Sequence, residues 1–150
     1  MQLLFRIVIL WIVTAGAVWS SEKSDVMASV HRLVDAFNKG DSKAFLAACS
    51  DQTSIIDEIS PHEWHGTGGC SKWMSDYAVY VEKTKVADAV TTLGNPKRII
   101  ISADNAYVVV PAKCVYKQFG KPVNENVVVT VTLHKDDSGW QLTGWTWARL

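Results

Sequence analysis

Hydrophobic residues in the first half of the chain recur at helical spacing. Over residues 24–39 they return every three or four positions, which predicts an amphipathic helix with Ser24 as its N-cap. The apolar face is formed by Val26, Val30, Leu33, Val34 and Phe37. Gly40 is suited to end this helix in the left-handed conformation, and Asp41 is suited to cap a second helix over residues 42–49.

A strand and a third helix are predicted next. Residues 53–59 (TSIIDEI) are rich in β-branched side chains and predict a strand, which Ser60-Pro61 ends. The third helix is predicted over about residues 70–83. Its apolar face is formed by Trp73, Met74, Tyr77, Tyr80 and Val81.

From Lys85 onward the pattern alternates with a period of two, which is typical of strands. The predicted strands cover residues 86–93, 97–102, 106–119, 123–135 and 140–148. The first two form one long strand that is interrupted near residues 94–96, and short turns join the others as antiparallel neighbours. Helices followed by a meander predict an α+β fold, in which a strongly curved antiparallel sheet packs against three N-terminal helices and encloses a cone-shaped pocket.

The first twenty residues have the pattern of a secretory signal peptide. Arg6 precedes an uncharged, mostly apolar run over residues 7–18, and small residues allow cleavage near Ala17 or Ser20. A retained membrane anchor is the alternative, but twelve helical residues span about 18 Å, less than the roughly 30 Å of a bilayer core. We therefore expect a secreted or periplasmic protein with one domain over residues 21–150 and no stable membrane association after cleavage.

Composition narrows the classes of partner and cofactor. Fifteen basic and fifteen acidic residues balance without a basic stripe, which argues against nucleic acid as a partner. No phosphate-binding or dinucleotide-binding motif is present, and we expect no cofactor. Three cysteines leave two alternatives open, because Cys49 and Cys114 fit small buried apolar positions and a bridge from Cys49 to Cys70 is also compatible with the sequence.

Several short motifs, taken in order, resemble the nuclear-transport-factor-2-like superfamily. They are AFNKGD, the segment with Asp51 and Asp57, the His-Gly turn before the third helix, and the final DDSGWQL hairpin. The chain is most similar to the SnoaL-like and ketosteroid-isomerase-like domains, over about residues 25–149. The resemblance implies a curved sheet and three helices around a pocket, commonly with a homodimer formed through the outer face of the sheet. Because this fold supports isomerases, dehydratases, hydrolases and binding proteins, it does not fix the activity.

Asp57 is the first candidate catalytic residue. The resemblance implies that it occupies the position of the general base in ketosteroid isomerases, and burial among isoleucines would raise its pKa. Alternation also allows Asp57 to face solvent and Glu58 to face the interior. The oxyanion-stabilising residues of that family are replaced by Leu33 and by Val128 or a neighbour, so steroid isomerisation in its known form is not expected.

Two histidines near Asp57 are candidate acid–base partners. His62 and His65 flank Trp64 in the loop after the predicted strand, and an imidazole can transfer protons near neutral pH. The alternative is that both are surface residues without a role. Two imidazoles without an evident third ligand do not predict a metal site.

Aromatic and small residues are expected to line the pocket, although aromatic residues at helical spacing also fit a plain core. The predicted lining comprises Trp64, Trp73, Tyr77, Tyr80, Val110, Cys114 and Tyr116. On the last strand, Trp140 and Leu142 are expected to face inward, which places Trp145 and Trp147 on the outer face as a homodimer interface. A bulge at Gly144 would instead turn both tryptophans into the pocket.

The sequence as a whole predicts an exported protein that binds a small, largely apolar ligand and forms a homodimer. One alternative is a lyase, isomerase or hydrolase that uses Asp57 with His65 or His62. Another is an interaction module that uses the outer face of the sheet. The sequence does not decide whether the protein is an enzyme.

Overall fold

The computed structural model describes the backbone of residues 15–150 and the side chains of residues 21–150. The predicted signal peptide and its two cleavage points, Ala17 and Ser20, therefore lie outside the part whose side chains are described. Within the described part, no helix is both long enough and apolar enough to span a membrane.

In the part of the chain that the structure describes, three helices precede most of the sheet, as the helical spacing predicts. They are α1 (Ala15–Lys39), α2 (Ser42–Ala48) and α3 (Gly69–Thr84). Gly40 has a φ of +65°, and the Asp41 carboxylate accepts a hydrogen bond from the backbone N–H of Ala44 at 3.0 Å. These two residues stop α1 and start α2 within one turn, as predicted. Ser24 lies inside α1, so its predicted role as N-cap is wrong.

Within the described residues 15–150, the sheet is built from seven strands. They are β1 (Cys49–Ile56), β2 (Glu63–Trp64), β3 (Val86–Leu93), β4 (Arg98–Ser102), β5 (Asn105–Gln118), β6 (Lys121–Asp136) and β7 (Gly139–Arg149). Their order is β2-β1-β7-β6-β5-β3, and β4 continues the edge beside β5. All neighbours are antiparallel except β1 and β7, which run parallel, so the sheet is mixed rather than wholly antiparallel.

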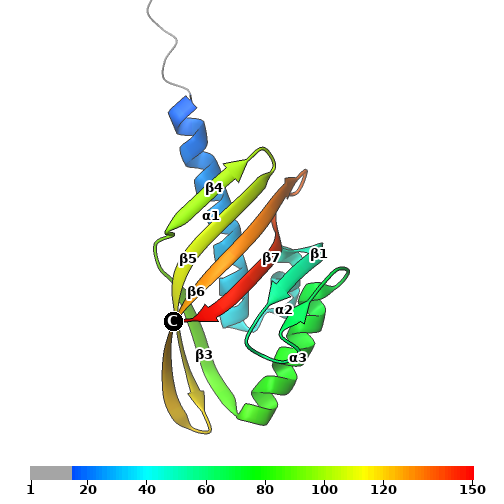
Figure 1. Ribbon diagram of the computed structural model, residues 1–150, viewed down its shortest axis with the longest axis vertical. Coiled ribbons are helices and arrows are strands. Elements are labelled where there is room, and N and C mark those ends of the chain that lie inside the picture. The colour runs from blue at the N-terminus through cyan, green and yellow to red at the C-terminus, as the bar shows by residue number, and fades with distance from the viewer. Residues whose placement is uncertain (1–14) are drawn as a thin grey trace, which may run out of the picture.

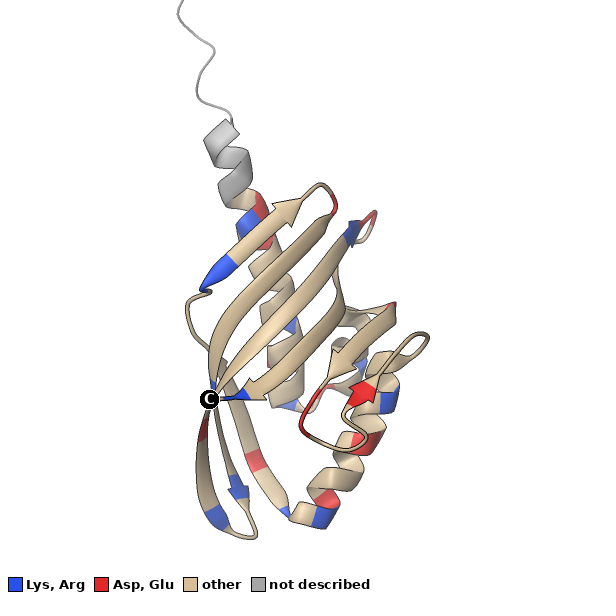
Figure 2. Cartoon of the chain, in the orientation of Figure 1, with Lys and Arg blue, Asp and Glu red and all other residues tan. Residues whose placement is uncertain are grey.

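The helices cover one face of this sheet and leave the other face open. In Figure 1, α1 runs behind β5 and β6, while α2 and α3 lie beside β1 and β7. The middle parts of the central strands contain few charged residues (Figure 2). The predicted α+β architecture is confirmed: three helices pack on a large curved sheet that remains open and forms a cone.

A shift in register near the start of β7 determines which side chains face the helices. Leu142 pairs with Leu133 but Gly144 pairs with Thr132, so Thr143 is an extra residue in β7. The bulge brings Trp145 and Trp147 onto the concave face, where Trp145 is only 6% exposed. Their predicted placement on the outer face, as a dimer interface, is therefore wrong.

Gly144 allows a close approach between β1 and β7. A Cβ atom at this position would lie 2.7 Å from the carbonyl oxygen of Ser54 in β1. A disulfide between Cys49 and Cys70 adds a second connection, joining the start of β1 to the first turn of α3. Cys114 is a buried free thiol.

Candidate functional site

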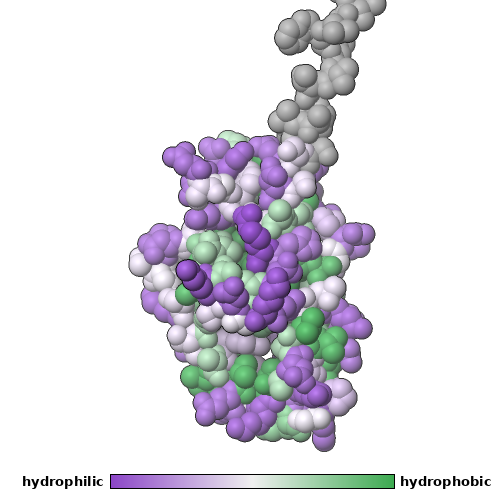
Figure 3. All heavy atoms as spheres, turned by 180° about the vertical axis from the view of Figure 1, so that it is seen from behind, coloured by the Kyte–Doolittle hydropathy of each residue, from purple (hydrophilic) through white to green (hydrophobic). Residues whose placement is uncertain are grey.

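A cavity of about 130 Å³ lies between α1, α3 and the concave face of the sheet. Aromatic side chains form much of its wall. They are Phe37, Phe45, Trp73, Tyr77, Tyr80, Tyr116, Trp145 and Trp147. Leu33, Val129 and Val131 also line it, so the walls are mostly apolar. On the helix side of the molecule, apolar residues gather toward the end away from the start of α1 (Figure 3).

Trp73 is the centre of the aromatic cluster. Its ring stacks on Phe45 at a centroid distance of 5.6 Å and on Tyr77 at 5.1 Å. The ring of Trp145 meets Trp73 at 5.4 Å and Phe45 at 5.9 Å, at nearly right angles in both cases. Stacked and perpendicular pairs are favourable aromatic geometries, so this wall of the cavity is held in place by its own contacts.

Asp57 is the acidic group that enters the apolar part of the cavity. It follows the last residue of β1, lines the cavity, and is half-buried. One carboxylate oxygen accepts a hydrogen bond from the indole Nε1 of Trp73 at 3.0 Å, and the other accepts one from the backbone N–H of Ile59 at 3.2 Å. Burial raises the pKa of Asp57 above its usual value, and these hydrogen bonds partly oppose the rise. Among the described residues, no ion pair includes Asp57.

Neither candidate histidine faces the Asp57 carboxylate. The Nδ1 atom of His62 lies 3.3 Å from the backbone carbonyl oxygen of Asp57, and His62 is exposed. His65 is exposed as well and pairs with Glu63 at 3.3 Å. The predicted pairing of Asp57 with one of these imidazoles is therefore wrong, because the loop turns both rings outward.

Five of the seven predicted lining residues lie at the cavity: Trp73, Tyr77, Tyr80, Cys114 and Tyr116. The other two are placed elsewhere. Trp64 is buried outside the cavity, where its Nε1 donates a hydrogen bond to Asp76 at 2.8 Å. Val110 is fully buried in the core.

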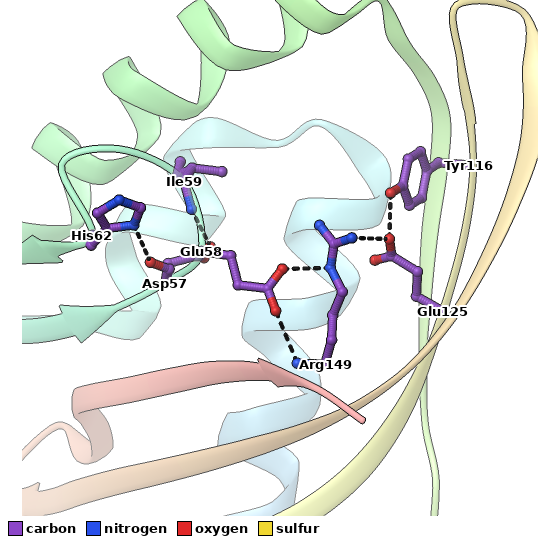
Figure 4. A network of polar contacts seen from close by, with 7 residues as sticks. All are labelled: Asp57, Glu58, Ile59, His62, Tyr116, Glu125 and Arg149. Atoms are coloured by element: carbon purple, nitrogen blue, oxygen red, sulfur yellow. Dashed lines mark hydrogen bonds and ion pairs between the residues drawn. The ribbon is translucent and has the colours of Figure 1, made fainter.

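A polar network that the sequence patterns do not predict borders the cavity. Arg149, near the end of β7, forms ion pairs with Glu58 and with Glu125, the latter at 2.9 Å. The hydroxyl of Tyr116 donates a hydrogen bond to Glu125 at 2.6 Å. Figure 4 shows the guanidinium group between the two glutamates, which come from the loop after β1 and from β6. The network thus connects the loop after β1 with β5, β6 and β7 beside Asp57.

The described residues contain no group of three or more potential metal-binding side chains. Cys114 lines the cavity, but burial raises the pKa of its thiol, and the hydroxyl of Thr91 lies 3.6 Å from its sulfur. A raised pKa keeps the thiol protonated, which is the opposite of what a nucleophilic cysteine requires. The carboxylate of Asp57 is therefore the strongest candidate for a functional group in this cavity.

Comparisons with known proteins identify the fold. No family model matches the chain, and no curated protein matches it at a significant level. Among solved structures, a ketosteroid isomerase-like protein from Erwinia carotovora atroseptica superimposes with a TM-score of 0.68 at 20% identity, over 86% of this chain and 96% of the other. A nuclear transport factor 2-like superfamily protein from Salmonella enterica serovar Typhimurium gives 0.74 at 15% identity, over 87% and 92%. A putative dehydratase of the same fold from Streptomyces avermitilis gives 0.71 at 14% identity, over 87% and 98%.

Proposed function

We propose that this chain, which has the nuclear-transport-factor-2-like fold, is an exported protein that binds a small ligand with an apolar body in its aromatic cavity. The observation that carries the proposal is the cavity itself, because its mostly aromatic walls include the half-buried carboxyl group of Asp57. Cavities of about 150 Å³ with apolar walls bind benzene, so a volume of about 130 Å³ suits a ligand with one ring.

Export is supported by two independent features. The first twenty residues have the signal-peptide pattern, and Cys49 and Cys70 form a disulfide. Disulfides form and persist mainly in oxidising compartments such as the periplasm or the extracellular space. Fractionation of cells that express the full chain tests this location. The mature protein is expected in the periplasm or the medium, and an uncleaved chain in the membrane fraction would contradict it.

Ligand binding can be tested with benzyl alcohol as a one-ring probe, by isothermal titration calorimetry. Ala89 lines the cavity from β3, whereas Ala87 on the same strand is exposed and lies outside it. We expect Ala89→Phe to weaken binding at least tenfold, because the added ring takes up space in the cavity. Ala87→Phe adds the same ring outside and should leave the affinity within about twofold. Equal affinity in both variants would show that the probe binds elsewhere.

Proton transfer by Asp57 is a second candidate function. It is favoured by the raised pKa of this carboxyl group in an apolar cavity, which is the setting that makes an aspartate a usable base. Two structural neighbours, described as a ketosteroid isomerase-like protein and a putative dehydratase, agree with this chemistry. Tyr77 and Tyr80 line the same cavity and would supply phenolic hydroxyls as hydrogen-bond donors.

An exchange experiment tests this second candidate without knowledge of the substrate. The protein is incubated with acetophenone in D₂O, and deuterium uptake at the carbon beside the carbonyl group is followed by NMR. A general base typically accelerates such a step by about 10²–10⁴-fold, so Asp57→Asn should reduce the rate by that order. Equal rates for the wild type and the variant would contradict a role for Asp57 as base.

A homodimer through the outer face of the sheet is proposed as the quaternary state. Uncharged side chains meet there on neighbouring strands, because Tyr107 pairs with Ile100 and Thr132, and Pro111 pairs with Val128. The central strands that form this face contain few charged residues (Figure 2), and a surface with few charges is suited to burial against a second copy. Sedimentation velocity should give a dimer that Tyr107→Glu dissociates, and a wild-type monomer at high concentration would contradict the proposal.

A further inference from the structure

Acidic residues outnumber basic residues on the lining of the cavity, and this imbalance indicates which charge a ligand should carry. The charged residues that line it are three acids and one base, namely Asp57, Glu58, Glu125 and Arg149. The single base is already engaged, since its guanidinium group forms ion pairs with both glutamates. An anionic ligand would therefore find no free cation on the lining and would be repelled by Asp57.

Asp57 differs from the two glutamates because its carboxylate has no cationic partner among the described residues. Both carboxylate oxygens accept hydrogen bonds, from Trp73 and from the backbone of Ile59, and each donor stabilises the ionised form. A neutral ligand that filled the cavity would remove water from this carboxylate without replacing its charge. Loss of solvent without a compensating charge is costly for an ionised group.

The surrounding rings favour the same class of ligand. Aromatic faces attract cations, and aromatic cages are a general means of binding organic ammonium groups. In this cavity Trp145, Trp147 and Tyr80 line the same space as Asp57. A ligand of this class would place its ammonium group beside the carboxylate and its apolar body among the rings. It would therefore interact favourably with both the charged and the aromatic part of the wall.

We infer that the ligand of this cavity is a small organic cation, an amine with a one-ring or similarly sized apolar body, whose ammonium group pairs with Asp57. This inference rests on the proposed binding function and specifies the class of its ligand. Asp57 then forms an ion pair with the ligand, and the aromatic wall limits the size of the apolar body. Glu58, Glu125 and Arg149 together carry a net negative charge, which disfavours anionic ligands.

Three probes of similar size separate the inference from the proposed function. Benzylamine, benzyl alcohol and benzoate carry a positive, a neutral and a negative substituent on the same ring, and their dissociation constants can be measured by calorimetry at pH 7. For the wild type we expect benzylamine to bind at least about tenfold more tightly than benzyl alcohol, because it gains an ion pair and cation–π contacts, and benzoate to bind most weakly. If benzyl alcohol or benzoate binds as tightly as benzylamine, the inference fails while the binding function stands. If none of the three binds, both fail.

Two variants identify the group that selects the charge. Asp57→Asn keeps the size of the side chain and should reduce the preference for benzylamine over benzyl alcohol to within about threefold. Asp137→Asn makes the same change in the exposed turn between β6 and β7 and should keep the wild-type preference. A preference that survives in folded Asp57→Asn overturns the inference. The three-probe comparison on the wild type decides the question even if that variant does not fold.

Discussion

Replacing Trp145 by alanine tests the inward turn of β7, on which the aromatic wall depends. Trp145 is 6% exposed and contacts the rings of Phe45 and Trp73 edge to face. Removing a buried tryptophan typically costs about 3–5 kcal/mol, and each aromatic pair contributes about 0.5–1.5 kcal/mol of that beyond its buried area. Because the site adjoins an existing cavity, the neighbouring side chains cannot readily fill the space, and we expect a cost of about 4 kcal/mol.

The assay is urea unfolding followed by far-UV circular dichroism, because seven tryptophans make fluorescence changes hard to assign. Trp147→Ala is the comparison: Trp147 is only partly buried, so its loss should cost about 1–2 kcal/mol. Trp145→Phe keeps one ring and should cost less than Trp145→Ala. A cost below about 1 kcal/mol for Trp145→Ala, together with dissociation of a dimer, would refute the inward placement.

Three further predictions concern the elements that support the cavity. Reduction of the bridge between Cys49 and Cys70, which are 21 residues apart, should lower the free energy of unfolding by about 3 kcal/mol, measured by urea unfolding with and without reductant; an unchanged midpoint would contradict this. Gly144→Ala places a Cβ atom 2.7 Å from the carbonyl oxygen of Ser54 and should cost about 1–3 kcal/mol in the same assay, and a neutral effect would show that β1 can move away from β7. Burial raises the folded-state pKa of Asp57 above 3.8, so the native state binds this proton more tightly. The contribution of Asp57 to wild-type stability therefore falls as the pH rises from below 3.8 through the folded pKa. The stability of Asp57→Asn relative to the wild type should therefore increase over that interval and then stay constant, in unfolding curves recorded from pH 3 to pH 7; a relative stability that decreases with pH would contradict the burial of this carboxyl group.

Local patterns were sufficient to predict most of the elements of this fold. The helical spacing of Val26 and Val30 and the pair Gly40-Asp41 correctly predict the helix over residues 24–39, its end, and the start of α2, whereas the start of α1 at Ala15 is not predicted. Strict alternation through β5 correctly predicted that Cys114 and Tyr116 face inward. These features depend on residues close in the sequence, for which period and capping chemistry are strong signals.

Local sequence patterns do not predict the features that depend on pairing between strands distant in the sequence. The parallel contact of β1 with β7 joins segments about ninety residues apart, as in the pair of Ile55 and Trp145. The bulge at Thr143 reverses the side-chain parity of β7, and Gly144 was the only local indication of it. The same bulge turns Arg149 toward Glu58 and Glu125, so the polar network could not be anticipated without it.

The sequence predicts most of the aromatic lining of the candidate site, but only some of its polar groups. Asp57 reaches the cavity, as burial among isoleucines indicated, but it follows β1 instead of lying within it. His62 and His65 are close to Asp57 in the sequence, yet their loop turns both rings to solvent. Side chains in irregular loops have no fixed periodicity, so sequence spacing alone does not determine their direction.

The central claim is that the cavity beside Asp57 holds a one-ring ligand, and a crystal structure of the protein soaked with benzyl alcohol tests it most directly. The account predicts electron density for the ring inside the cavity, in contact with Trp145 and within hydrogen-bonding distance of the Asp57 carboxylate. An unoccupied cavity at a probe concentration that saturates the protein in solution, or density only on the outer surface, would contradict it.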